Sequence, residues 1–153
     1  MLARIRKATD EKEEGFTLIE LLVVMIIIGI LAAIAIPVFL SQRNKAQDTA
    51  VKADVSTIGK EIATYYVDGT GTGSVAIAGG KYIFTPTTPP VGSPATIDMG
   101  RVSKNVTVKD GAITNILSDT AWCIGLENLK GDTKTYKYSS AAGLTSGVCV
   151  GAV

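Results

Sequence analysis

The chain has 153 residues, of which 46% are hydrophobic, and its formal net charge is +1. This length is enough for one small globular domain, and the nearly balanced charge does not require nucleic acid or an acidic surface as a partner. Histidine is absent, which removes the commonest acid/base at neutral pH and the commonest metal ligand. We therefore expect no enzymatic activity, no cofactor and no metal site.

A short, highly charged segment runs from Met1 to Gly15 and precedes an uncharged apolar run from Leu21 to Leu40. At about 1.5 Å of rise per residue, the apolar run nearly matches a hydrocarbon core of roughly 30 Å, so it predicts one membrane-spanning helix. Its N-terminal flank carries basic residues, and the positive-inside tendency places the rest of the chain outside the cytoplasm. These basic residues are Arg4, Arg6, Lys7 and Lys12.

Glu20 lies at the N-terminal edge of this apolar segment, where an unpaired carboxylate costs about 2 kcal/mol or more. We therefore expect it to have a partner.

The sequence Gly-Phe-Thr-Leu-Ile-Glu at positions 15–20, followed by apolar residues up to Pro37, resembles the class III prepilin signal of type IV pilins and type II secretion pseudopilins. The resemblance implies that a prepilin peptidase cuts between Gly15 and Phe16 and then methylates the new N-terminus at Phe16. One departure is that a basic residue usually stands just before the glycine, whereas this chain has two glutamates there.

The implied division of the chain is a cleaved leader (1–15), a transmembrane and assembly helix (16–40) and a globular pilin domain (41–153). A competing interpretation uses Ala33-Ile34-Ala35 as a signal peptidase site, which would discard everything before Ile36. It is disfavoured because Glu20 interrupts the start of the segment and because apolar residues continue past this site to Leu40.

The chain becomes amphipathic after Pro37. Val51, Val55, Ile58, Ile62 and Tyr65 recur at spacings of four, three, four and three, which is typical of a helix packed on a core. We predict one helix from Thr17 to Tyr66, with a protruding first half and a packed second half. Its charged residues, Asp48 and Asp54 among them, are placed on the solvent sides, and Asp68-Gly69 ends it with a left-handed glycine.

Short runs rich in β-branched and aromatic residues follow, separated by Gly, Pro and Asp. They predict antiparallel strands joined by turns, and a single sheet packed across the helical stripe would bury both. The predicted strands are 81–85, 102–108, 112–117, 121–126, 133–139 and 147–150. Residues 69–74 and 85–94 are predicted surface loops, and the fold class is α+β, as the resemblance to pilins also implies.

Cys123 and Cys149 lie in the part predicted to be exported, where thiols meet an oxidising environment. A disulfide between them would stabilise the domain by roughly 3.5 kcal/mol in the chain-entropy model. Two buried free thiols are the alternative. The segment between these two cysteines also resembles the disulfide-bounded region of many pilins. Trp122, Tyr65 and Tyr66 are predicted to pack in the core or at its edge, and Asn105-Val106-Thr107 matches a glycosylation sequon.

Cleavage after Gly15 would create a cationic amine on Phe16. We predict that a neighbouring, axially staggered subunit presents this amine to Glu20 and so fixes the register of assembly; the resemblance implies the same role. Gly29 and Ala33 form a small-xxx-small pair that lets helices approach closely. Pro37 removes the backbone donor to the Ala33 carbonyl, so the interval 29–37 should bend or melt in a filament.

The resulting hypothesis is a structural subunit of a type IV pilus, a self-assembling surface filament for adhesion and twitching motility. Its implied partners are the prepilin peptidase, a platform membrane protein and a cytoplasmic ATPase. It would sit in the cytoplasmic membrane before assembly and in an extracellular pilus afterwards. The alternatives are a type II secretion pseudopilin and a DNA-binding competence pilin; the latter needs a basic patch that a net charge of +1 does not indicate.

Overall fold

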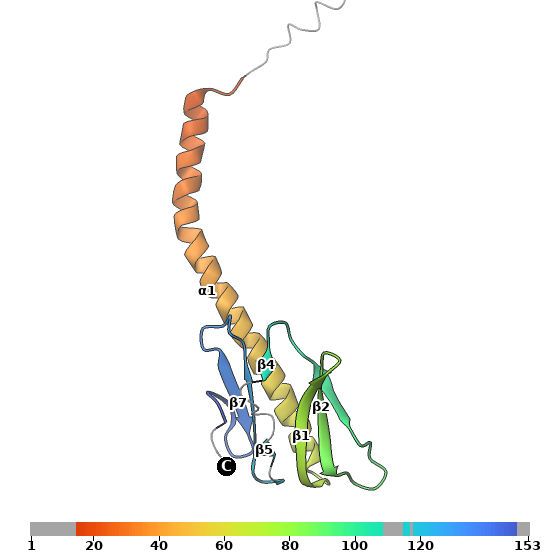
Figure 1. Cartoon of the computed structure of the whole chain (residues 1–153). Helices are drawn as coiled ribbons and strands as arrows, with labels where there is room; N and C mark the ends of the chain where they lie inside the picture. Colours follow the sequence, from red (N-terminus) through yellow and green to blue (C-terminus); the bar gives the residue numbers. More distant parts are fainter. Residues whose placement is uncertain (1–14, 109–114, 117, 150–153) are drawn as a thin grey trace, which may run out of the picture. The chain divides into compact units, whose positions relative to one another are not determined.

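The computed structural model of the chain describes residues 15–108, 115–116 and 118–149. The leader up to residue 14 therefore lies outside the described residues. The chain divides into two compact units, Met1–Leu40 and Ser41–Val153, and one helix, α1 (Leu18–Tyr65), has residues in both (Figure 1). The strands that follow are β1 (Thr70–Ala78), β2 (Lys81–Thr88), β3 (Ile97–Arg101), β4 (Thr107–Val108), β5 (Asn115–Ile116), β6 (Trp122–Glu127), β7 (Thr135–Ser139) and β8 (Gly143–Ser146).

The long helix agrees with the predicted span to within one residue at each end. Its first part consists of apolar residues that stay exposed in the isolated chain, including Leu21, Ile28 and Phe39. Within the described part of the chain, α1 is the helix that is long and apolar enough to cross a membrane by length and composition. Pro37 lies inside it without ending it.

The strands form one antiparallel sheet in the order β3-β2-β1-β5-β6-β7-β8, and β4 pairs with β6 outside this path. The register places Val75 of β1 opposite Phe84 of β2, and Ile124 of β6 opposite Tyr138 of β7. The predicted antiparallel sheet and the α+β class are confirmed.

The core of the second unit lies between the predicted helical stripe and the sheet. Val51, Val55, Ile58 and Ile62 are fully buried, and Tyr65 is nearly so. They share one cluster with side chains from the strands: Val75, Tyr82, Phe84, Met99, Trp122, Ile124, Leu126 and Tyr136. The helical periodicity therefore identified the buried face correctly.

At Gly59, α1 packs closely against Tyr138 of β7. A Cβ added at this buried position would overlap the ring of Tyr138. In an exposed helix, replacing glycine by alanine stabilises by about 1 kcal/mol. At Gly59 the same replacement should destabilise the fold, because overpacking forces side chains out of their rotamers.

We therefore expect Gly59→Ala to destabilise the second unit by about 1–3 kcal/mol, measured by thermal unfolding of the mature chain in detergent. Ala63→Gly, at an exposed position of the same helix, is the control and should cost about 1 kcal/mol. A stabilised Gly59→Ala variant would contradict the packing at Tyr138.

Two aspartates of α1 are buried, contrary to their predicted place on the solvent sides. Asp48 is 6% exposed and accepts hydrogen bonds from the backbone N–H groups of Asp132 (3.1 Å), Thr133 (2.9 Å) and Lys134 (3.1 Å). It thus fixes the loop between β6 and β7 on the helix. Burial is tolerated because three donors replace the lost water.

Asp54 anchors a second connection, between β3 and β4. Its carboxylate accepts hydrogen bonds from the Tyr82 hydroxyl (2.9 Å), from the backbone N–H of Ser103 (2.9 Å) and from the Ser103 hydroxyl (2.7 Å). Burial, together with the negative charge and hydrogen bond of Asp54, raises the pKa of Tyr82. The phenol therefore stays a donor at any physiological pH.

Several predicted strand and loop positions are wrong. Residues 70–74 belong to β1 rather than to a loop, β2 continues to Thr88, and β3 was not predicted. The predicted strand 102–108 is reduced to its last two residues. The last strand is 143–146 rather than 147–150; of the latter, residue 150 lies outside the described residues, as do 112–114 and 117 of the predicted strand 112–117.

Gly69 follows the helix as predicted but for a different reason. It is not among the glycines with positive φ. Its N–H donates to the Tyr65 carbonyl (2.8 Å), and a Cβ there would overlap the Tyr65 ring and carbonyl. Glycine is therefore needed here because a side chain would not fit, and not because the backbone is left-handed.

Candidate processing and assembly site

The helix begins with a reciprocal cap formed by Thr17 and Glu20. Glu20 Oε2 accepts hydrogen bonds from the backbone N–H of Thr17 (2.8 Å) and from its hydroxyl (2.7 Å). The Glu20 N–H in turn donates to Thr17 Oγ1 (3.2 Å). This is a capping box, in which a threonine before the first turn and a glutamate three residues later satisfy each other's backbone donors.

Glu20 therefore has a partner inside its own chain, whereas the sequence-based prediction placed its partner only in a neighbouring subunit. The threonine-to-glutamate spacing that defines a capping box is visible in the sequence, but the prediction considered only a positively charged partner. The bonds to Thr17 leave Glu20 a net negative charge. The need for a cationic partner in an apolar environment therefore remains.

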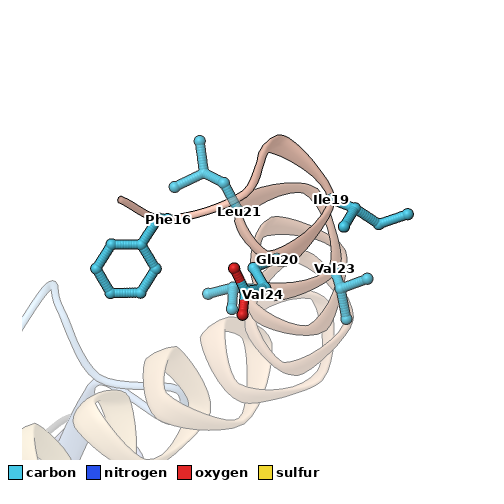
Figure 2. Close-up of a pocket in the computed structure, with 6 residues that line it drawn as sticks. All are labelled: Phe16, Ile19, Glu20, Leu21, Val23 and Val24. Carbon is cyan, nitrogen blue, oxygen red and sulfur yellow. The ribbon is translucent and has the colours of Figure 1, made fainter. Parts of the chain in front are cut away.

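The surroundings of the Glu20 carboxylate are apolar. The side chains of Phe16, Ile19, Leu21, Val23 and Val24 border the same surface hollow (Figure 2). Phe16 is 91% exposed, so none of the residues that the structure describes covers its side chain. The Glu20 carboxylate is thus an acidic hydrogen-bond acceptor within an apolar surface.

Gly15 and Phe16 precede α1 and have no regular secondary structure. The peptide bond between them is thus outside the helical hydrogen-bonding pattern. An exposed bond outside regular secondary structure is accessible to a peptidase. The structure places both predicted processing residues next to the cap.

Gly29, Ala33 and Pro37 lie farther along the same helix, so the structure does not bring them together with Glu20. Gly29 is nine residues beyond Glu20, or about 13 Å along the axis. A Cβ added at Gly29 would contact none of the residues that the structure describes, and Ala33 is exposed. The helix is continuous from Gly29 to Pro37 in the isolated chain, and melting of this interval in a filament stays a prediction.

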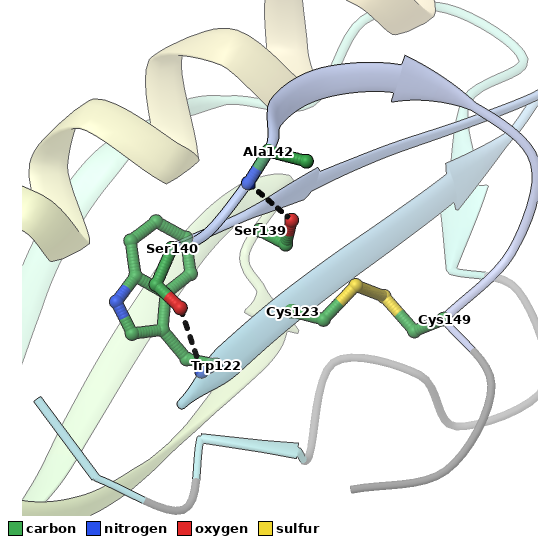
Figure 3. The surroundings of a disulfide bond; sticks show 6 residues. All are labelled: Trp122, Cys123, Ser139, Ser140, Ala142 and Cys149. Atoms are coloured by element: carbon green, nitrogen blue, oxygen red, sulfur yellow. Dashed lines mark hydrogen bonds between the residues drawn. A yellow bond between two sulfur atoms is a disulfide. The ribbon is translucent and has the colours of Figure 1, made fainter. Parts of the chain in front are cut away.

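The structure contains the expected disulfide between Cys123 and Cys149, whose Cα atoms are 5.9 Å apart (Figure 3). Cys123 is buried on β6, and the bond ties the segment after β8 back to the middle of the sheet. Beside it, the Trp122 ring stacks on Tyr138 at 5.8 Å between centroids. Trp122 is a packing residue, as predicted.

The side chain of Asn105, the acceptor residue of the sequon, already takes part in a hydrogen bond of the fold. Asn105 is held at φ 63°, and its side-chain amide donates to Gln47 Oε1 (3.3 Å) on α1. Gln47 also accepts from the Asn128 amide (2.8 Å). A sugar on Asn105 would have to break this contact between helix and loop.

Among the described residues, no group of three or more His, Cys, Asp or Glu side chains could hold a metal ion.

Residues 12–36 match the family described as the prokaryotic N-terminal methylation motif. The N-terminal segment is a prepilin methylation motif. The chain is similar to the type II secretion system core protein G of Pseudomonas aeruginosa. The two are 40% identical over 57 residues, which are 37% of this chain and 40% of the relative. The type IV wide pilus major component PilA4 of Thermus thermophilus is 49% identical over 55 residues, or 36% of this chain and 42% of the relative.

A longer match is to the type IV major pilin protein PilE1 of Neisseria gonorrhoeae. It is 32% identical over 102 residues, which are 67% of this chain and 56% of the relative. The chain thus spans about half the length of the curated relatives it matches. No solved structure gives a significant match. The resemblance to pilins and pseudopilins that the N-terminal residues indicate is confirmed.

Proposed function

We propose that this chain is a structural subunit of a type IV pilus. In this proposal, a prepilin peptidase cleaves it between Gly15 and Phe16 and methylates Phe16, and its N-terminal helix then polymerises into a surface filament. The observation that carries the proposal is the prepilin motif at the start of a 48-residue helix, with one carboxylate in an apolar surface.

The pilin function is favoured over that of a pseudopilin by how far the similarities extend. The match to PilE1 covers 102 residues, which is more than the N-terminal segment and α1 together. The matches to core proteins G cover 57 and 81 residues, so they are shorter than the match to PilE1. The greater length of the PilE1 match supports the pilus.

The helix gives each subunit an anchor before assembly and a packing surface after it. Transfer from lipid into a bundle of similar helices exchanges one apolar environment for another, so hydrophobicity supplies little drive. Packing at Gly29 and Ala33 and the pairing of Glu20 with a neighbouring Phe16 amine then decide the register. A platform membrane protein and a cytoplasmic ATPase would supply the work of extraction, and the subunit itself has no enzymatic role.

Processing can be tested separately from assembly. We expect Gly15→Val to leave the precursor uncut in the membrane, because a branched side chain would stand at the cleaved bond, where the motif has glycine. Intact mass and N-terminal sequencing of the chain from its native cells give the readout. The matched control is Gly29→Ala, which adds a methyl group that meets no other described residue of the chain and should be processed normally.

In the unaltered chain, a mature product that starts with methylated Phe16 is expected. A product that starts at Ile36 would contradict the proposal and support removal by signal peptidase.

A further inference from the structure

The turn between β6 and β7 carries an apolar side chain that the described part of the chain leaves in solvent. Leu129 is 71% exposed. Its backbone is nonetheless fixed, because the side-chain oxygen of the buried Asn128 accepts a hydrogen bond from the Lys130 N–H (3.1 Å), and the Asn128 carbonyl accepts one from the Gly131 N–H (3.0 Å). The turn thus presents Leu129 and Lys130 from a fixed base.

Hydrogen bonds attach this turn to α1, beside which it lies (Figure 1). The Asn44 amide of α1 donates to Asp132 Oδ1 (3.2 Å), and Gln47 Oε1 accepts from the Asn128 amide (2.8 Å). Asn44 is only four residues beyond Leu40, the end of the apolar run, and even an extended chain covers at most about 14 Å over four residues. The headgroup layer on each side of a bilayer is about 5–8 Å thick. A membrane-spanning run that ends at Leu40 therefore keeps the turn within reach of the headgroups.

Basic side chains gather at the same end of the second unit. Three segments meet there: residues 43–48 of α1, residues 127–134, and residues 103–105, which are joined to α1 by the bond from Asn105 to Gln47 (3.3 Å). Their basic side chains are all exposed: Arg43, Lys45, Lys104, Lys130 and Lys134.

The acidic side chains of these three segments are fewer and less exposed. Asp48 is buried among backbone N–H groups, Asp132 accepts the hydrogen bond from Asn44, and Glu127 is half-buried at the end of β6. This end of the unit is therefore basic, although the whole chain has a net charge of only +1.

We propose that Leu129 and the five bases form a headgroup-contact surface, which seats the domain on the anionic lipid of the bilayer before assembly. The proposal rests on the membrane-anchored stage of the proposed function. Each base close to an anionic membrane strengthens such a contact about fivefold. Leucine beside lysine suits this depth, because the apolar side chain enters the boundary with the acyl chains while the ammonium group stays in water. The contact must be released when the subunit leaves the membrane.

The test measures whether lipid touches the tip of the turn. The mature chain with Leu129→Trp is anchored in vesicles of phosphatidylcholine and phosphatidylglycerol, with the phosphatidylglycerol either brominated or not. Bromine quenches tryptophan on contact, and the emission of Trp122, which is buried, is subtracted using the unsubstituted chain. We expect the added emission to shift to the blue and to lose most of its intensity with brominated phosphatidylglycerol. In vesicles of brominated phosphatidylcholine alone, it should change little.

The position control is Val67→Trp. Val67 is an apolar residue that is 84% exposed, and it follows the end of α1, about 30 Å along the helix from Asn44. Its added emission should not be quenched. An unquenched Leu129→Trp chain would overturn the proposal and leave this surface to a neighbouring subunit. Equal quenching at positions 67 and 129, or equal quenching by brominated phosphatidylcholine alone, would overturn it as well.

The charge control compares two exposed lysines in the Leu129→Trp chain. Lys130→Gln should raise the fraction of phosphatidylglycerol needed for half-maximal quenching, because the loss of one base weakens the contact about fivefold. Lys60→Gln, on α1 but outside the three segments, should leave that fraction unchanged, and equal effects of the two variants would contradict a specific headgroup contact. Retention of the disulfide checks that each variant is folded. Because the vesicles contain no assembly machinery, failure of the lipid contact and failure of pilus assembly are distinguishable.

Discussion

Replacing Glu20 by leucine is expected to leave cleavage after Gly15 intact and to abolish filament formation. In the proposed assembly, the substitution leaves the cationic amine of a neighbouring Phe16 unpaired in an apolar bundle, at a cost of about 3–5 kcal/mol per contact. This corresponds to a loss on the order of a hundredfold or more in the strength of each contact. Electron microscopy of surface fibres and N-terminal sequencing of the membrane-bound chain measure the two outcomes independently.

The capping box makes a sharper comparison possible. Leucine at position 20 removes both the negative charge and the cap on Thr17, whereas glutamine keeps an acceptor that can reach the Thr17 N–H. If the charge pair determines assembly, Glu20→Gln should also lack filaments. If only the cap matters, Glu20→Gln should assemble and Thr17→Val should fail. Normal filaments from Glu20→Leu would remove this carboxylate from the mechanism altogether.

The second large effect is expected at Asp48. Asp48→Ala removes one buried acceptor group that binds three backbone N–H groups of the loop between β6 and β7. Because bonds to a charged acceptor are strong and their loss leaves donors unsatisfied, we expect a loss of about 3 kcal/mol in the free energy of unfolding. Thermal unfolding of the mature chain in detergent is the measurement.

Local consequences should accompany the global one. Lys134, one of the three donors, has φ 68°, a backbone conformation that L residues rarely adopt. Without Asp48 the loop should relax, and hydrogen exchange of the amides of residues 132–134 should accelerate. Gly131→Ala should cause a similar defect, because a Cβ there would overlap Asp48 Oδ1.

The control is Glu61→Ala, which removes an exposed carboxylate from the same helix and should change stability by less than about 0.5 kcal/mol. Equal stability of Asp48→Ala and Glu61→Ala would show that the loop does not depend on this anchor.

The elements that the sequence predicted well are those with strong local periodicity. The 3.6-residue repeat from Val51 to Tyr65 defined both the second half of α1 and its buried face. The strands centred on Ile124 and Tyr136 were found for a similar reason, since β-branched and aromatic residues cluster there. The failures lie where glycine, threonine and proline form strands, as in β1 and the end of β2, because turn composition and exposed strand composition are alike in these residues.

The N-terminal motif, the membrane-compatible length of the apolar run and the place of Glu20 within it were determined by the sequence alone, because each depends on residues that are close together in the chain. The roles of Asp48, Asp54 and Gly59 were decided only by the tertiary structure. Their partners, Lys134, Ser103 and Tyr138, are 86, 49 and 79 residues away. Whether a helical carboxylate meets water or buried N–H groups depends on which loop crosses it, and no local pattern in the helix contains that information.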